Sequence, residues 1–184
     1  MNAETIHRMG PEGWVDLLEA GHPIAEDELA GHEYRGVSLG LPAVIEKLTW
    51  KKFRKAFHRE GGALRGWNVR LEQNGLEGPD RPKRRRGEPF TFGHFAVRPL
   101  AGYRLGRYRG RPVEVPEGLM LDYGLGANGL DPIRFLRDPI VALRPGDATL
   151  LFGWSYLDLG IRRVPTPSFF TLERAGPITH VPLR

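Results

Sequence analysis

The sequence predicts a mainly β fold of the α+β class: an antiparallel, strongly curved sheet or a β-barrel of about 6–8 strands. From residue 64 onward, apolar residues recur at every second position, which is the spacing of strands with one buried face. The connections between these segments are rich in glycine and proline, and only residues 41–59 have the pattern of a helix long enough for a parallel crossover, so antiparallel pairing is expected. A sheet of this size that bends at glycines tends to close on itself.

The chain length and composition indicate one globular domain over residues 1–184. Hydrophobic residues make up 40% and charged residues 27% of the 184 positions, values that are ordinary for a folded protein. We divide the domain into an N-terminal extension, residues 1–28, a helix-plugged barrel, residues 29–174, and a C-terminal tail, residues 175–184.

Two helices are expected. Residues 11–20 begin with a proline suited to a first helical turn and place Trp14, Leu17 and Leu18 on one stripe. Residues 41–59 form a longer amphipathic pattern at a spacing of 3.6 residues, with lysines and arginines on the opposite face. One charge, Lys52, falls within the apolar arc of that longer helix. We therefore expect the helix over residues 41–59 to pack at or over the barrel opening with Lys52 pointing toward the sheet.

The strands are expected in a regular series. Residues 139–144 and 149–159 flank a Pro-Gly-Asp turn and form the clearest hairpin. Gly153, inside the second arm, indicates a bend or bulge. Residues 103–108 are either a ragged edge strand or a loop, and the other expected strands are residues 29–38, 64–73, 89–98, 118–124 and 168–174.

The strand pattern resembles the meandering barrels of lipocalin-like (calycin) proteins, above all in residues 147–160 followed by residues 168–174. Residues 34–53 also look like small bacterial proteins with a Gly-x-Trp-x-Gly signature, although residues 36–40 lack its tryptophan. The resemblance extends over residues 29–174 and carries no catalytic motif. It implies a small apolar ligand in the barrel.

Several classes of site are excluded or not indicated. The chain has no cysteine, so disulfides, thiolate metal sites and a cysteine nucleophile are excluded. The six histidines are scattered without metal-ligand spacing, and no cofactor fingerprint stands in a suitable context, so no metal and no cofactor are expected. The N-terminus lacks the apolar core of a secretory signal, and no apolar run reaches the roughly 20 residues of a membrane span, so we expect a cytoplasmic protein.

The first functional hypothesis is a carrier or sensor that binds a small apolar or amphipathic ligand. Aromatic residues are dense in the bending strands, and ligand cavities are mostly apolar with a few polar groups. The expected ligand-binding residues are Lys52, Trp67, Phe92, Trp154, Tyr156 and Phe170.

The second hypothesis is an isomerase, cyclase or lyase that uses the same cavity without a cofactor. His94, Asp122 and Tyr156 are polar residues embedded in apolar strand segments. A histidine and an aspartate can act together as a general base and a tyrosine can donate a proton, provided that they converge in one pocket.

The third hypothesis is binding to an anionic surface, either nucleic acid or an anionic membrane. The net charge is +5, and a basic run lies within the exposed loop of residues 81–86. The residues expected to make these contacts are Lys47, Lys51, Arg54, Lys55, Arg84, Arg85 and Arg86.

Overall fold

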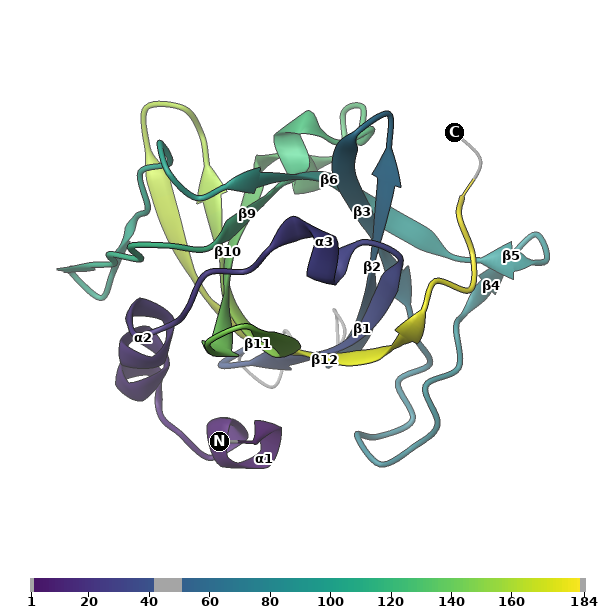
Figure 1. Cartoon of the computed structure of the whole chain (residues 1–184), viewed down its shortest axis with the longest axis horizontal. Coiled ribbons are helices and arrows are strands. Elements are labelled where there is room, and N and C mark those ends of the chain that lie inside the picture. Colours follow the sequence, from purple (N-terminus) through teal and green to yellow (C-terminus); the bar gives the residue numbers. More distant parts are fainter. Residues whose placement is uncertain (1, 42–50, 183–184) are drawn as a thin grey trace.

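Eight antiparallel strands close into a barrel in the computed structural model, which describes residues 2–41 and 51–182 (Figure 1). Each barrel strand pairs with the barrel strands before and after it in the chain, and β12 closes the ring by pairing with β1. The predicted fold class, an antiparallel β-barrel, is thus confirmed. The strands are β1 (His32–Leu39), β2 (Lys52–Glu60), β3 (Ala63–Arg70), β6 (Thr91–Pro99), β9 (Leu119–Asp122), β10 (Leu136–Arg144), β11 (Asp147–Asp158) and β12 (Arg163–Pro177).

The remaining elements are short. The predicted N-terminal helix is confirmed as α2 (Pro11–Glu19), and its Trp14, Val15 and Leu18 are buried. Within residues 2–41 and 51–182, no helix has the length and apolarity to cross a membrane. The other elements are α1 (Ala3–His7), α3 (Glu26–Leu29), the 3-10 helices η1 (Tyr123–Leu125) and η2 (Pro132–Phe135), and two small hairpins, β4 (Arg84–Arg85) with β5 (Glu88–Pro89) and β7 (Arg107–Tyr108) with β8 (Arg111–Pro112).

The prediction of a helix over residues 41–59 was wrong for the part that the structure describes. Residues 52–60 form strand β2, which pairs with β1 on one side and β3 on the other, while residues 42–50 lie outside the described residues. Phe53 and Phe57 are four residues apart, a spacing that places two side chains on one face of either a helix or a strand. Strand pairing on both edges of β2 overrides the local helical pattern.

A different element closes one end of the barrel. The short helix α3 lies across the ring of strands in Figure 1, and its Leu29 is fully buried in the interior cluster with Phe57 and Leu64. The plug that we had assigned to residues 41–59 is therefore supplied at this end by the segment just before β1.

Apolar residues cover both faces of the barrel wall. The interior cluster includes Phe57, Phe95 and Leu172, and a second cluster forms outside the wall beneath α2 and the β7–β8 hairpin. That outer cluster contains Trp154 and Phe169, whose rings stack with centroids 6.1 Å apart. Since neighbouring residues on a strand face opposite ways, strands β11 and β12 contribute to both clusters.

Three inward-facing glycines make room for phenylalanines on the neighbouring strand. In each pair the glycine and the phenylalanine stand directly opposite each other, and a Cβ on the glycine would overlap the ring. Gly153, predicted to mark a bend, has this role. The pairs are Gly36 with Phe53, Gly66 with Phe95, and Gly153 with Phe170.

Candidate functional site

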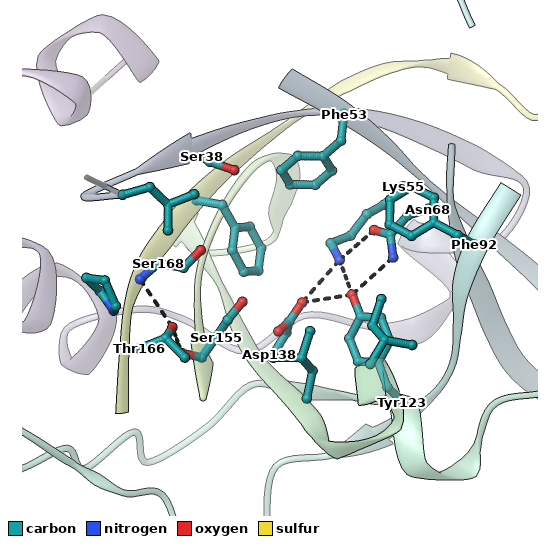
Figure 2. Close-up of a pocket in the computed structure, with 15 residues that line it drawn as sticks. Ser38, Phe53, Lys55, Asn68, Phe92, Tyr123, Asp138, Ser155, Thr166 and Ser168 are labelled. Atoms are coloured by element: carbon teal, nitrogen blue, oxygen red, sulfur yellow. Dashed lines mark hydrogen bonds and ion pairs between the residues drawn. The ribbon is translucent and has the colours of Figure 1, made fainter. Parts of the chain in front are cut away.

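A cavity of about 370 Å³ lies inside the barrel at the end away from α3. Its lining comes from the last residues of β1 and β3 and the first residues of β2, β10 and β12, all of which reach that end. The volume is in the range of small-molecule sites. The cavity is lined by Ser38, Leu41, Phe53, Lys55, Asn68, Phe92, Tyr123, Ile133, Leu136, Asp138, Ser155, Thr166, Pro167, Ser168 and Phe170 (Figure 2).

Lys55 is at the centre of a polar cluster on the cavity wall. It projects inward from β2 between Phe53 and Phe57, and only 2% of the residue is exposed. Its Nζ donates hydrogen bonds to Asn68 Oδ1 at 3.0 Å, to Asp138 Oδ2 at 3.1 Å and to Tyr123 Oη (Figure 2). Three acceptors around one Nζ are the complement of an ammonium group, which has three donor hydrogens.

The other members of the cluster complete one another's hydrogen bonds. Tyr123 Oη donates to Asp138 Oδ2 at 2.9 Å, and Asn68 Nδ2 donates to Gly93 O at 3.0 Å and to Tyr123 Oη at 3.3 Å. The four side chains come from β2, β3, the β9–η1 junction and β10. Closure of the sheet is what brings these four segments together.

Burial and the charge of Asp138 shift the pKa of Lys55 in opposite directions and the pKa of Tyr123 in the same direction. Burial lowers the pKa of the Lys55 ammonium, and the adjacent Asp138 carboxylate acts against that shift. Burial and then the charge of Asp138 raise the pKa of Tyr123 well above 10.0. Four aromatic rings surround Lys55 Nζ at 5.2–5.4 Å from their centroids, a distance at which a cation is attracted to the ring face. The rings belong to Phe53, Phe95, Tyr123 and Phe170.

One polar atom of the cluster is left over. Asp138 is 2% exposed, and its Oδ1 is buried and accepts no hydrogen bond from any residue that the structure describes. Figure 2 shows Asp138 between the Lys55–Tyr123 group on one side and the side chains of Ser155 and Thr166 on the other. The cavity therefore has mainly apolar walls, and Asp138 Oδ1 is the acceptor of the polar cluster that lacks a partner among the described residues. Residues with hydroxyl groups also line the cavity, namely Ser38, Ser155, Thr166 and Ser168.

Two of the expected ligand-binding residues line the cavity, namely Phe92 and Phe170. Trp154 and Tyr156 lie in the outer cluster, where their rings are 5.4 Å apart. Trp67 packs with Ala56 and Val69 in a separate cluster that Ile178 covers. Of the six expected residues, the structure thus brings only these two phenylalanines together in the cavity.

Lys52 is also buried, but it faces away from the cavity. Its Nζ donates to Gly78 O at 2.7 Å and to Pro79 O at 3.3 Å, and it lies 3.3 Å from Asp80 Oδ1. These contacts hold the loop between β3 and β4 against the outside of β2. The reason for placing Lys52 in the cavity was the helix over residues 41–59, which the structure replaces with a strand in this region.

The three residues considered for proton transfer have separate surroundings, and none is among the described residues that line the cavity. Asp122 accepts a hydrogen bond from Tyr103 Oη at 2.8 Å and pairs with Arg137 at 3.2 Å. The His94 ring lies 6.4 Å from that of Trp67, and Tyr156 is in the outer cluster. The structure therefore does not bring them together around the cavity.

The expected basic face over residues 41–59 is divided by the strand. Lys55 lies inside the barrel, whereas Arg54 pairs with Glu33 at 2.9 Å on the other side of β2. Lys47 lies outside the described residues. Arg84, Arg85 and Arg86 are exposed on the β4–β5 hairpin, as predicted for the basic loop.

Sequence reasoning missed Lys55, Asn68, Tyr123 and Asp138 as a group. Asn68 and Asp138 were assigned no role, and Lys55 was placed on the solvent-facing side of a helix. If residues 53–57 are interpreted as a strand with a period of two, Lys55 lies on the same face as Phe53 and Phe57. A lysine between two phenylalanines on one strand face would have indicated a buried lysine.

Together, the fold and the site define a closed up-and-down β-barrel with an internal cavity that carries a buried lysine–aspartate pair. No protein-family model, curated protein or solved structure matches the chain.

Proposed function

We propose that the protein binds a small amphipathic ligand in the barrel cavity, as a lipocalin-like carrier or sensor. The observation that carries the proposal is a cavity of about 370 Å³ whose walls are mainly apolar and whose charged groups form one buried cluster. Hydroxyl groups of serine and threonine supply the rest of its polar lining. An apolar ligand body would gain from leaving water, and the polar cluster would set its orientation.

The architecture supports the same proposal. An eight-stranded up-and-down barrel is just wide enough to hold one small ligand when side chains leave part of the interior unfilled. Here the α3 end is filled by Leu29, Phe57 and Leu64, and the unfilled part is at the opposite end.

The test is a fluorescence titration with N-phenyl-1-naphthylamine, a neutral apolar dye. The variant Ser168→Leu adds bulk at a residue that lines the cavity, and Ala175→Leu adds the same side chain at an exposed position of the same strand. We expect the dye to bind the unmodified protein and Ala175→Leu alike, and Ser168→Leu about tenfold more weakly or worse.

The proposal would be contradicted if the unmodified protein bound neither this dye nor any of three smaller naphthalenes, namely 2-naphthol, 2-methoxynaphthalene and 2-naphthoate. Equal binding by Ser168→Leu and Ala175→Leu would contradict the assignment of the cavity as the site. Thermal unfolding of both variants serves as the control for folding.

A further inference from the structure

We infer that the cavity selects ligands that offer a hydrogen-bond donor, such as an alcohol or phenol, over carboxylic acids of the same shape, because Asp138 Oδ1 is the polar atom of the buried cluster that lacks a partner among the described residues. This inference rests on the proposed function and narrows it to a chemical class of ligand. The observation behind it is independent of cavity size: it is the state of each donor and acceptor around Lys55.

The donors of the cluster are already engaged. Lys55 Nζ directs its three hydrogens to Asn68, Tyr123 and Asp138, and the Tyr123 hydroxyl donates to Asp138 Oδ2. Both hydrogens of the Asn68 amide are used as well, toward Gly93 O and Tyr123 Oη. A ligand carboxylate would therefore find no available N–H or O–H among these groups, although a lysine is present.

The charges of the cluster lead to the same conclusion. Lys55 and Asp138 form a buried pair, with side chains 3% and 4% exposed, in which one positive and one negative charge balance. A carboxylate placed beside them would add a second negative charge within a water-poor cavity, which is strongly unfavourable without a cation of its own. A neutral hydroxyl adds no charge.

The acceptor has no partner in the part of the chain that the structure describes and lies just beneath the cavity surface. Asp138 Oδ1 is buried without a partner among the described residues, and an unpaired buried carboxylate oxygen carries a desolvation cost that a ligand donor would remove. Asp138 lines the cavity on the side of Ser155 and Thr166, so a hydroxyl there lies at the polar end while the ligand body faces Phe53 (Figure 2).

The experiment compares three naphthalenes of nearly the same shape at pH 7 by calorimetric titration of the unmodified protein. The probes are 2-naphthol, which donates a hydrogen bond, 2-methoxynaphthalene, which cannot, and 2-naphthoate, which is charged. We expect 2-naphthol to bind about tenfold tighter than 2-methoxynaphthalene, and 2-naphthoate to bind most weakly.

A matched variant tests the role of the oxygen itself. In Asp138→Asn the amide oxygen would keep the partners Lys55 and Tyr123, and the NH₂ group would then face the cavity as a donor. The preference for 2-naphthol over 2-methoxynaphthalene should then shrink to about twofold or reverse. The three-probe comparison on the unmodified protein stands by itself if this variant does not fold.

The outcomes separate the two proposals. Binding of 2-naphthoate as tight as that of 2-naphthol, or equal binding of 2-naphthol and 2-methoxynaphthalene, would overturn the inference while leaving a ligand-binding cavity. If none of the three probes binds and N-phenyl-1-naphthylamine does not bind either, both the inference and the proposed function are overturned. An unchanged preference in a folded Asp138→Asn variant would also overturn the inference.

Discussion

Lys52 and Lys55, three residues apart on β2, carry their ammonium groups on opposite sides of the barrel wall. Lys52 holds an external loop through Gly78 O, whereas Lys55 stands inside against Asp138. Both residues are almost fully buried, at 1% and 2% exposure, so neither follows the usual rule that lysines lie in solvent. Each is buried for a different reason, and the two reasons predict different mutant behaviour.

Replacing Lys55 with methionine should destabilise the protein by about 3–5 kcal/mol, because Asp138 would be left as an uncompensated buried charge. The double variant Lys55→Met with Asp138→Leu should recover most of that loss, since a well-packed apolar pair often replaces a buried ion pair without cost. Urea unfolding of both variants and of Asp138→Leu alone measures the coupling. A double variant as unstable as the sum of the single variants would show that the pair is not an energetic unit.

Replacing Lys52 with methionine should loosen the loop that Lys52 holds and leave the cavity unchanged. The loss of charged hydrogen bonds to Gly78 O and Pro79 O should cost about 1.5–3 kcal/mol. Hydrogen exchange of the amides in residues 74–80 should become faster, and N-phenyl-1-naphthylamine should bind as before. Lys83→Met, at an exposed position, is the matched control and should change neither measurement. Weakened dye binding in Lys52→Met alone would contradict the separation of the two lysines.

The architecture was predictable because alternation, turn residues and the absence of long helical patterns after residue 64 all act locally and agree with one another. The error over residues 52–60 has an equally local cause: Phe53 and Phe57 are compatible with both periods, and the arginine, lysine and alanine between them favour a helix by propensity. What decides between the two is pairing with β1 and β3, which lies outside the segment itself.

The candidate site was predictable only in part, because its polar members meet through the closure of the barrel. Phe92 and Phe170 were found from aromatic content, which is a property of single strands. The polar cluster depends on which strands are neighbours and in which register, because that pairing brings Asn68, Tyr123 and Asp138 to Lys55. Residue spacing in the sequence does not predict this pairing. Likewise, Trp154 and Tyr156 were expected inside because the outer cluster, with its own aromatic core, was not foreseen.

Adding a methyl group at Gly153 and at Gly66 should have different consequences. At Gly153 the Cβ would press on Phe170, which borders the cavity and can shift into it, so ligand binding should weaken severalfold with a stability loss of about 1–3 kcal/mol. At Gly66 the Cβ would also meet Ala56 O, a backbone atom, so the destabilisation should be greater. Urea unfolding and dye titration of Gly153→Ala and Gly66→Ala make the comparison. Stronger dye binding by Gly153→Ala would contradict the expected shift of the ring.

Above pH 10.5 the folded protein should lose stability as the pH rises. Burial raises the pKa of Tyr34, Tyr123 and Tyr156, and it raises that of Tyr103 to about 12. Unfolded tyrosines release their protons near pH 10.0, so above that value the folded state binds more protons than the unfolded state and the free energy of unfolding falls. The lowered pKa of Lys55 has the opposite effect, because the unfolded lysine keeps its proton up to about pH 10.5 while the folded one releases it earlier. This effect increases the free energy of unfolding with pH, but only below pH 10.5.

The ultraviolet absorbance of phenolate follows these tyrosines directly, and urea unfolding at increasing pH follows their effect on stability. Tyr103→Phe should remove one group that titrates near pH 12 and leave the others in place. Titration of all the tyrosines of the folded protein near pH 10 would contradict the assignment of buried phenols.

The Gly153–Phe170 pair offers a route to redesign the interior of this barrel. Because the pair joins the smallest residue to a large one at facing positions, their combined volume would be unchanged if the two residues exchanged places. An exchange at Gly153 and Phe170 would move one aromatic ring from β12 to β11 and carry the boundary of the cavity with it. The shape of the cavity, and with it the shape of the ligand that fits, can therefore change through exchanges between adjacent strands. The total side-chain volume inside the barrel stays the same.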